Sequence, residues 1–300
     1  MCGIVGLFLK DPTLEPELGR FTAAMLEVMT ERGPDSAGFA IYGAARPNFV
    51  KLTVRLPATV HMAVLADELA GAIGAPVDAQ ARSDHAVLQV PETLAPAARK
   101  YLAQRSPAIR AVSTGNRMEL FKGVGLPDDV SQRFGLGGMA GTHAIGHTRM
   151  ATESAVTTAG AHPFSTGLDQ CLVHNGSLSN HNSLRRTLAR EGFEMETAND
   201  TEVAAGYLSW RMSQGAALDE ALTAALSDLD GFYTFVVGTE TGFGVLRDPI
   251  ACKPAVMAET DRYVAFGSEY RVLVDLPGIE TATIFEPEPA RVYFWERAAA

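Results

Sequence analysis

A cysteine stands at position 2, directly after the initiator methionine. If Met1 is removed, this residue carries both a thiol and a free α-amino group. The reference pKa values are about 8 for the amine and about 8.5 for the thiol, so part of the amine is unprotonated at neutral pH and can accept the thiol proton. An N-terminal residue that uses its own amine as the base is a known kind of nucleophile. Cys2 could also simply begin a buried strand, so its position leaves both interpretations open.

Two further clusters centre on arginines. Arg32 opens the sequence Arg-Gly-Pro-Asp, where a predicted helix ends in a turn. Arg149 ends an apolar run and enters a loop that contains Thr152. A guanidinium at such a point can hold a carboxylate through two parallel hydrogen bonds. Taken alone, each arginine could instead be an ordinary residue at the end of a helix or strand.

Two polar clusters follow in the second half of the chain. The side-chain amide of Asn175 and the backbone N–H of Gly176 could point at one developing oxyanion, and each such donor is worth about 10²–10³ in the rate of acyl transfer. An Asn-Gly pair also commonly forms a turn. Asp200 begins a predicted helix, where a carboxylate could either cap the helix or bind the ammonium of a substrate.

These residues must be positioned by a mixture of strands and helices. Strands are expected at 2–9, 37–42, 49–56, 143–150 and 170–174 and repeatedly between 233 and 295, and helices at 15–32, 180–191, 201–212 and 218–229. Strands at both ends with helices between them fit an α+β fold in which two sheets pack face to face with helices outside. A segment at about 57–112 reads helix, strand, helix, strand and indicates a small α/β insertion.

The composition argues against several classes of function. The 300 residues carry a formal net charge of −10, which argues against nucleic acid or an anionic membrane as the main partner. The three cysteines form neither a disulfide framework nor a zinc pattern, and Cys171 and Cys252 are predicted to be buried, inert thiols. Neither a signal peptide nor a membrane span is expected, so we predict a cytoplasmic protein. No metal or cofactor site is predicted in this chain.

The five clusters occur in the order and sequence context of a known family. They are Cys2, the Arg32-to-Asp35 motif, His147-Thr-Arg149, His174-Asn-Gly176 and Asp200-Thr-Glu202. The chain resembles the class II glutamine amidotransferases, whose glutaminase domain is an N-terminal-nucleophile (Ntn) hydrolase. The resemblance implies a four-layer αββα sandwich of two antiparallel sheets. It covers most of residues 1–300, read as a single glutaminase domain, but not the insertion at about 57–112.

The resemblance also implies roles for individual residues. Cys2 would attack the side-chain amide of L-glutamine and form a γ-glutamyl thioester, with its own amine as base. Asn175 and Gly176 would stabilise the oxyanion.

The remaining residues would bind the substrate. Arg149, helped by the Thr152 hydroxyl, would clamp the α-carboxylate, and Asp200 would pair with the α-ammonium. Arg32 would support the nucleophile loop. Met150 and Glu153 differ from the residues that several relatives carry at these positions. The sequence therefore does not predict how the pocket closes, but the predicted chemistry is unaffected.

The consumer of the ammonia is not visible in the sequence, so we expect a heteromeric complex with a separate synthase subunit. The chain looks most like the stand-alone glutaminase subunit of glutamate-synthase-like complexes such as N-methylglutamate synthase, where FMN and iron–sulfur centres sit on partner subunits. Two alternatives stay open. One is a catalytically silent regulatory or assembly subunit with the same fold, and the other is an Ntn amidohydrolase for a different amide.

Overall fold

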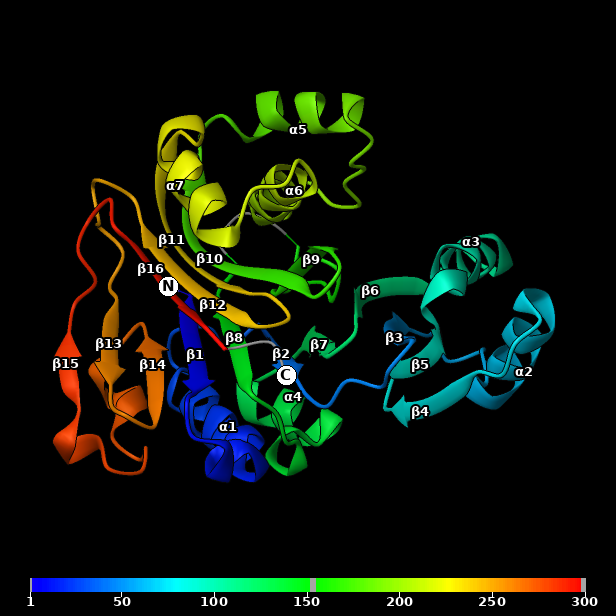
Figure 1. Ribbon diagram of the computed structural model, residues 1–300, viewed down its shortest axis with the longest axis horizontal. Helices are drawn as coiled ribbons and strands as arrows, with labels where there is room; N and C mark the ends of the chain where they lie inside the picture. Colours follow the sequence, from blue (N-terminus) through cyan, green and yellow to red (C-terminus); the bar gives the residue numbers. More distant parts are fainter. Residues whose placement is uncertain (1, 152–154, 298–300) are drawn as a thin grey trace.

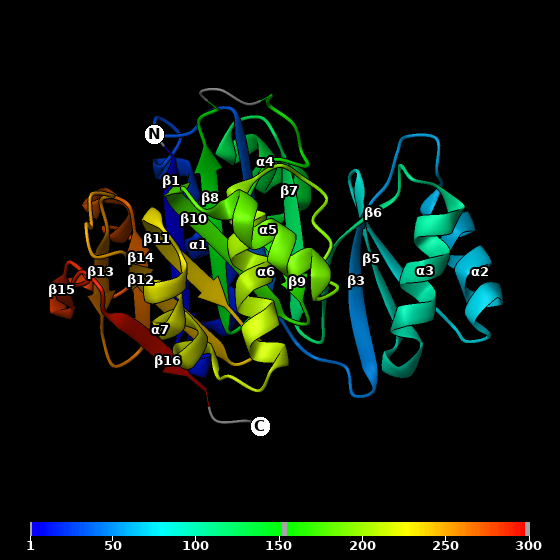
Figure 2. The ribbon, with the colours of Figure 1, turned by 90° about the horizontal axis from the view of Figure 1, so that it is seen from above.

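The computed structural model describes residues 2–151 and 155–297. Two antiparallel sheets lie face to face, and helices cover the outer face of each (Figures 1 and 2). This arrangement confirms the predicted α+β fold with four αββα layers. The fold places the start of the first strand, and with it Cys2, between the sheets and close to the ends of several other strands.

The first sheet has seven strands in the order β15-β13-β14-β1-β8-β2-β7. Their bounds are β1 Gly3–Leu9, β2 Ser36–Tyr42, β7 Met118–Val124, β8 His143–Arg149, β13 Val256–Glu259, β14 Tyr263–Gly267 and β15 Thr283–Phe285. β1 lies between β14 and β8, with Gly3 opposite Thr148 and Val5 opposite Gly267. The start of β1 therefore meets the ends of both neighbours.

The second sheet has five strands in the order β16-β12-β11-β10-β9. Their bounds are β9 Phe164–Gly167, β10 Gln170–Leu178, β11 Gly231–Gly238, β12 Gly242–Arg247 and β16 Val292–Glu296. A fully buried apolar core that includes Ile4, Ile145, Val173 and Phe243 fills the space between the sheets. This core fixes which residues of β8 and β10 face one another.

The outer helices pack on the sheets through buried residues. On the seven-stranded sheet lie α1 (Leu18–Val28) and α4 (Pro127–Phe134), and on the five-stranded sheet lie α5 (His181–Arg190), α6 (Asp200–Ser213) and α7 (Leu218–Asp228). The buried residues form one face on α1 and α4 but run without a break from Thr201 to Ser209 in α6. The helix predicted at 15–32 is shorter than expected. Residues Pro12–Glu17 form a 3-10 turn that contains Pro16, and α1 starts only after it.

A third sheet lies to one side of the sandwich (Figure 1). It has the order β4-β5-β3-β6, with β3 Phe49–Arg55, β4 Asp78–Arg82, β5 His85–Pro91 and β6 Arg110–Gly115, and it packs on α2 (Met62–Ile73) and α3 (Ala95–Arg105) around an apolar core of its own. Because β3 pairs with both β5 and β6, this sheet extends beyond the 57–112 segment: β3 precedes the segment and β6 crosses its end.

Two details differ from the sequence-based expectations. Cys171 is buried between the sheets, and burial raises the pKa of its thiol to about 12. Cys252 is exposed instead of buried, because it lies in the loop between β12 and β13. No helix in the described ranges is long and apolar enough to cross a membrane.

Candidate active site

The backbone carbonyl of Cys2 is held from two sides. Arg32 Nε donates a hydrogen bond to it at 3.0 Å, and Asn175 Nδ2 donates another at 3.2 Å. The Cys2 side chain is half-buried, and its Sγ lies 3.8 Å from the carbonyl oxygen of Met150. Because Met150 directly follows Arg149, the thiol faces the loop that carries the predicted clamp.

Arg32 is itself fixed by an ion pair. Its Nη1 lies 2.9 Å from Glu269 Oε1, and Arg271 Nε lies 2.6 Å from the other oxygen of that carboxylate. Partial burial alone would raise the pKa of Glu269, but the hydrogen bond from Arg32 and the charge of Arg271 outweigh this effect and lower the pKa below its usual value. Arg32 thus contacts the backbone of Cys2, the predicted nucleophile.

The rest of the Arg32 motif holds the end of β8. Asp35 donates its backbone N–H to the Arg149 carbonyl at 3.1 Å and accepts the N–H of Ala151 at 2.8 Å. A Cβ at Gly33 would lie only 2.4 Å from the carbonyl carbon of Thr148, so a glycine is needed for this close approach. These contacts fix the backbone around Arg149, whose side chain is buried and donates to the carbonyl of Ala155 at 3.4 Å.

Asn175 lies inside β10, so the alternative of an Asn-Gly turn is wrong. Its Nδ2 also lies 3.3 Å from Ser268 Oγ, and its Oδ1 is 3.2 Å from His147 Nε2. Gly176 has a φ of +145°, and a Cβ there would lie 1.9 Å from the Phe232 carbonyl oxygen. The strand continues through this position because a glycine can adopt the required conformation.

Asp200 is the first residue of α6, but it is not the cap. Asn199 caps the helix, because its side chain accepts the N–H of Thr201 at 2.8 Å. Asp200 Oδ2 accepts the N–H of Leu178 at 2.9 Å, and Oδ1 is 3.9 Å from His174 Nδ1. The carboxylate therefore forms a hydrogen bond with the end of β10, three residues after Asn175.

Three buried histidines lie near Asn175; His147 and His174 belong to the predicted clusters, but no role was predicted for them, and His162 was not predicted at all. The rings of His147 and His162 stack at 4.0 Å, and the Thr201 hydroxyl lies 3.0 Å from His174 Nδ1 and 3.3 Å from His162 Nε2. Burial lowers the pKa of His147 to about 3 and that of His174 to about 4, although Asp200 opposes the shift of His174. Burial also holds the pKa of His162 well below its usual value. All three rings are thus neutral at pH 7.

A sequence signal for two of them existed. His147 and His174 stand in apolar runs next to Arg149 and Asn175, where a polar side chain needs a buried partner. His162 lies in the loop before β9, and nothing in its sequence context indicates that it stacks on His147.

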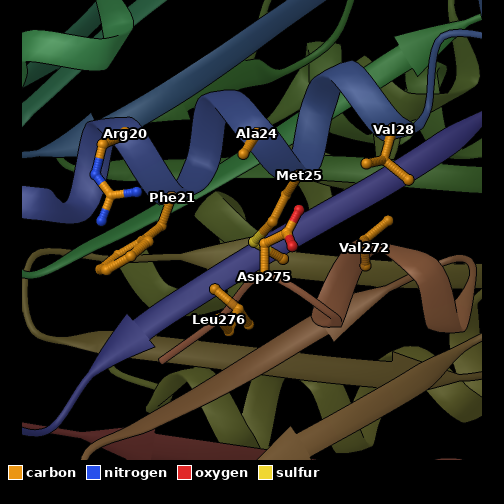
Figure 3. Close-up of a pocket in the computed structure, with 8 residues that line it drawn as sticks. All are labelled: Arg20, Phe21, Ala24, Met25, Val28, Val272, Asp275 and Leu276. Atoms are coloured by element: carbon orange, nitrogen blue, oxygen red, sulfur yellow. The ribbon is translucent and has the colours of Figure 1, made fainter. Parts of the chain in front are cut away.

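Three cavities within the described part of the chain differ in size and in distance from Cys2. One of about 260 Å³ is lined by Ser268 and Glu269 and by residues 251–256, so it adjoins the contacts of Cys2. A second, of about 530 Å³, separates the third sheet from the sandwich. The third, between α1 and residues 272–276, measures about 30 Å³, which is room for about one water (Figure 3). Among the described residues, no group of three or more His, Cys, Asp or Glu side chains is arranged to hold a metal ion.

The structure therefore brings Cys2, Arg32 and Asn175 into direct contact, with Arg149 and Gly176 beside them in the strands. Asp200 joins them through the end of β10. Thr152 lies outside the described residues.

Comparison with known proteins identifies the kind of domain to which this site belongs. A family model described as a glutamine amidotransferase domain matches residues 147–275. The chain is 61% identical to the glutamine amidotransferase-like protein GlxB of Rhizobium meliloti over 100% of both chains. It is 34% identical to a putative glutamine amidotransferase of Methanothermobacter thermautotrophicus, over 98% of this chain and 99% of that one.

Larger proteins match over part of their length. The amidophosphoribosyltransferase of Synechocystis is 34% identical over 69% of this chain and 42% of its own length. The structure of glutamine phosphoribosylpyrophosphate amidotransferase from B. subtilis superposes with a TM-score of 0.63 at 21% identity, over 98% of this chain and 47% of that one. The chain thus spans about half of that enzyme, and the superposition shows that the two share a fold.

Proposed function

The chain belongs to the class II glutamine amidotransferases, which hydrolyse glutamine, and from this premise we propose that Cys2 is its nucleophile and that a synthase partner receives the ammonia. The observation that carries the proposal is the pair of hydrogen bonds from Arg32 and Asn175 to the Cys2 carbonyl. Both bonds position Cys2 through its backbone. The thiol and, after loss of Met1, the α-amino group remain for chemistry.

The reaction would proceed through a thioester. The Cys2 sulfur attacks the γ-carboxamide carbon of L-glutamine while the α-amino group takes the thiol proton, directly or through a water. The tetrahedral intermediate then collapses, the proton passes to the leaving nitrogen, and ammonia departs. Water hydrolyses the γ-glutamyl thioester to glutamate and restores the thiol.

Asn175 and Gly176 would stabilise the oxyanion. Support comes from the orientation of the Asn175 amide, whose Nδ2 already faces Cys2. The same Nδ2 is within reach of Ser268 Oγ, so it would exchange this weaker contact for the oxyanion during attack. A donor prepared in this way needs little reorganisation in the transition state.

Arg149, Thr152 and Asp200 would select a free amino acid. A buried guanidinium suits an α-carboxylate, and a carboxylate at the start of α6 suits an α-ammonium. Buried groups of this kind reject substrates that leave them unpaired. An amide without these two charges would therefore bind poorly, which favours glutamine over the alternative of a different amide.

The partner would dock over the cavity of about 260 Å³ next to Ser268 and Glu269. Large apolar side chains are exposed around it, with Ile250 68% and Tyr270 58% accessible. Such clusters mark interaction surfaces. We propose a cytoplasmic complex in which the partner is glutamate-synthase-like, as in N-methylglutamate synthase, and carries FMN and iron–sulfur centres. In this reading residues 1–300 are one glutaminase domain with an insertion at about 57–112.

Purification of the native chain with its partners tests these proposals. Glutamate release from L-glutamine should disappear in Cys2→Ala, and intact mass should show loss of Met1 from the active protein. Residual release in Cys2→Ala at the wild-type rate, or an active chain that retains Met1, would refute the mechanism. A native preparation without any copurifying synthase would refute the partner assignment but not the hydrolysis.

A further inference from the structure

A cavity of about 530 Å³ lies away from Cys2, between the third sheet and the sandwich. Small-molecule sites commonly have volumes of roughly 300–1,000 Å³. One wall comes from β3, α3 and β6, and the other comes from β9, the loop before it and residues 192–197 between α5 and α6. An isolated bridge between Thr114 and Leu168 joins the two sides, and β6 and β9 lie side by side in Figure 1.

The two walls carry opposite charges. Arg55, Arg99 and Arg110 line the wall that belongs to the third sheet, and Glu194 and Glu196 line the other.

With the rest of residues 2–151 and 155–297, the three arginines make only long contacts. Arg110 Nη1 is 3.8 Å from Glu196 Oε2, Arg99 Nη1 is 3.3 Å from Thr114 Oγ1, and Arg55 Nε is 3.4 Å from Asp84 Oδ2. Strong charge-assisted hydrogen bonds measure about 2.7–2.9 Å, and a guanidinium has five N–H donors. The three side chains thus keep donor capacity for an anion in the cavity.

The other charged groups of the cavity wall hold the walls in place instead. The Glu202 carboxylate accepts the backbone N–H groups of Glu196 and Thr197, each at 2.7 Å. Lys122 is buried and donates to the carbonyl of Ala161 at 2.8 Å. Because these two groups already form hydrogen bonds with the backbone of the wall, recognition of a ligand would fall to the three arginines and the two exposed glutamates.

Two segments of the wall that belongs to the sandwich lead directly to the candidate active site. The segment 158–166 follows the loop after Arg149 and contains His162, which stacks on His147. The segment 192–197 ends three residues before Asp200, and Glu202 ties it to α6. A ligand that pulls the walls together would therefore move the backbone near Arg149 and Asp200, which are proposed to bind glutamine.

We propose that this cavity binds a small zwitterionic metabolite, with a carboxylate or phosphate held by Arg55, Arg99 and Arg110 and an amine facing Glu194 and Glu196, and that binding changes the affinity for glutamine. The binding site stands on the geometry of the cavity alone. The effect on glutamine rests on the proposed function.

Calorimetric titration of the full chain tests the binding. The probes are γ-aminobutyrate and phosphoethanolamine, together with butyrate and ethyl phosphate, which lack the amine. None of them is an α-amino acid, so none matches a site built for one. The two acidic groups distinguish a carboxylate ligand from a phosphate ligand.

We expect saturable binding of at least one zwitterion, tighter than that of its amine-free counterpart. Arg110→Ala should weaken it by about tenfold or more, because a hydrogen bond to a charged group is lost. Glu196→Gln should weaken only the zwitterion. Lys100→Ala is the matched control: it removes an exposed cation of α3 that does not line the cavity, and it should bind as the wild type does. Circular dichroism confirms that each variant is folded.

Absence of saturable binding by all four probes, or wild-type binding by both Arg99→Ala and Arg110→Ala, would overturn the site. A glutamate-release assay with the bound probe should show a changed KM for glutamine, and an unchanged KM would overturn the coupling. A chain that binds the probe but releases no glutamate, alone or with its partners, would refute the proposed function and leave the binding site standing.

Discussion

Replacing His147 by asparagine should lower kcat for glutamine hydrolysis while KM stays near its wild-type value. His147 Nε2 lies 3.2 Å from Asn175 Oδ1, and the amide nitrogen of Asn175 faces the Cys2 carbonyl. Burial lowers the pKa of His147 to about 3, so the ring is neutral at pH 7 and has a single N–H. If this proton is on Nε2, it can donate to Oδ1 and fix which end of the amide faces the nucleophile.

The magnitude follows from the cost of reversing that amide. A net hydrogen bond of about 1 kcal/mol corresponds to a change of about fivefold in the population ratio of the two amide orientations. In the reversed orientation the amide oxygen faces the nucleophile, and a donor worth about 10²–10³ in rate is lost. A fivefold change in this ratio lowers the native population by at most about fivefold. Because the contacts to Cys2 and Ser268 still support the native orientation, we expect kcat to fall by up to about fivefold instead of vanishing.

A matched pair of variants separates orientation from general damage. His147→Gln can place its side-chain nitrogen near the position of Nε2, whereas the shorter His147→Asn side chain reaches only the position of Nδ1. Both variants lose the stacking on His162, so melting temperatures should fall similarly. Steady-state kinetics should show a higher kcat for His147→Gln than for His147→Asn. Equal kcat in both variants, or a KM that rises as kcat falls, would refute the orienting role.

Three other perturbations test separate parts of the structure. Arg149→Lys should raise the KM for glutamine by about tenfold or more with kcat largely kept, because a point charge cannot replace a bidentate clamp; an unchanged KM would argue against the clamp. Burial lowers the pKa of His143 from 6.5 to about 3, so the unfolded chain binds this proton more readily and acid should destabilise the fold, by about 1.4 kcal/mol for this group between pH 7.5 and 5.5. Urea denaturation at the two pH values measures the loss, and His143→Gln should lack that share of it. Gly176→Ala should destabilise the fold by about 3 kcal/mol or more, because its Cβ would meet the Phe232 carbonyl at 1.9 Å, whereas Ser177→Ala on the exposed part of the same strand should not; similar denaturation midpoints for both would contradict the conformational argument.

The sequence predicted the layers well because most elements have a clear apolar period. The strand β2 and the helix α7 lie within one or two residues of the expected bounds. The strand β4 was missed because its sequence, Asp-Ala-Gln-Ala-Arg, is mostly polar at the edge of its sheet. The short helix α4 was missed because it spans only eight residues. Both elements depend on tertiary contacts for their stability more than on the propensity of their short sequences.

The candidate site was predictable as a set of residue types but not as a set of contacts. The motif order indicated that Arg32 supports the nucleophile, yet only the structure shows that it binds the Cys2 carbonyl and pairs with Glu269. That ion pair joins residues 237 positions apart. The stacking of His162 on His147 is equally invisible in a local pattern, because it depends on how the loop before β9 returns to the sheet.

The position of Asn175 shows why the site and the packing of the two sheets cannot be separated. Asn175 belongs to the five-stranded sheet, but the three partners of its side chain among the described residues all belong to or flank strands of the seven-stranded sheet. They are Cys2, His147 and Ser268. The surrounding interface is apolar, and a polar group inside it is costly unless its partners are in place. The bonds that orient the amide toward the nucleophile therefore also fix the alignment of the sheets. A shift between the sheets would therefore disturb this amide, because its side-chain partners lie on the opposite sheet.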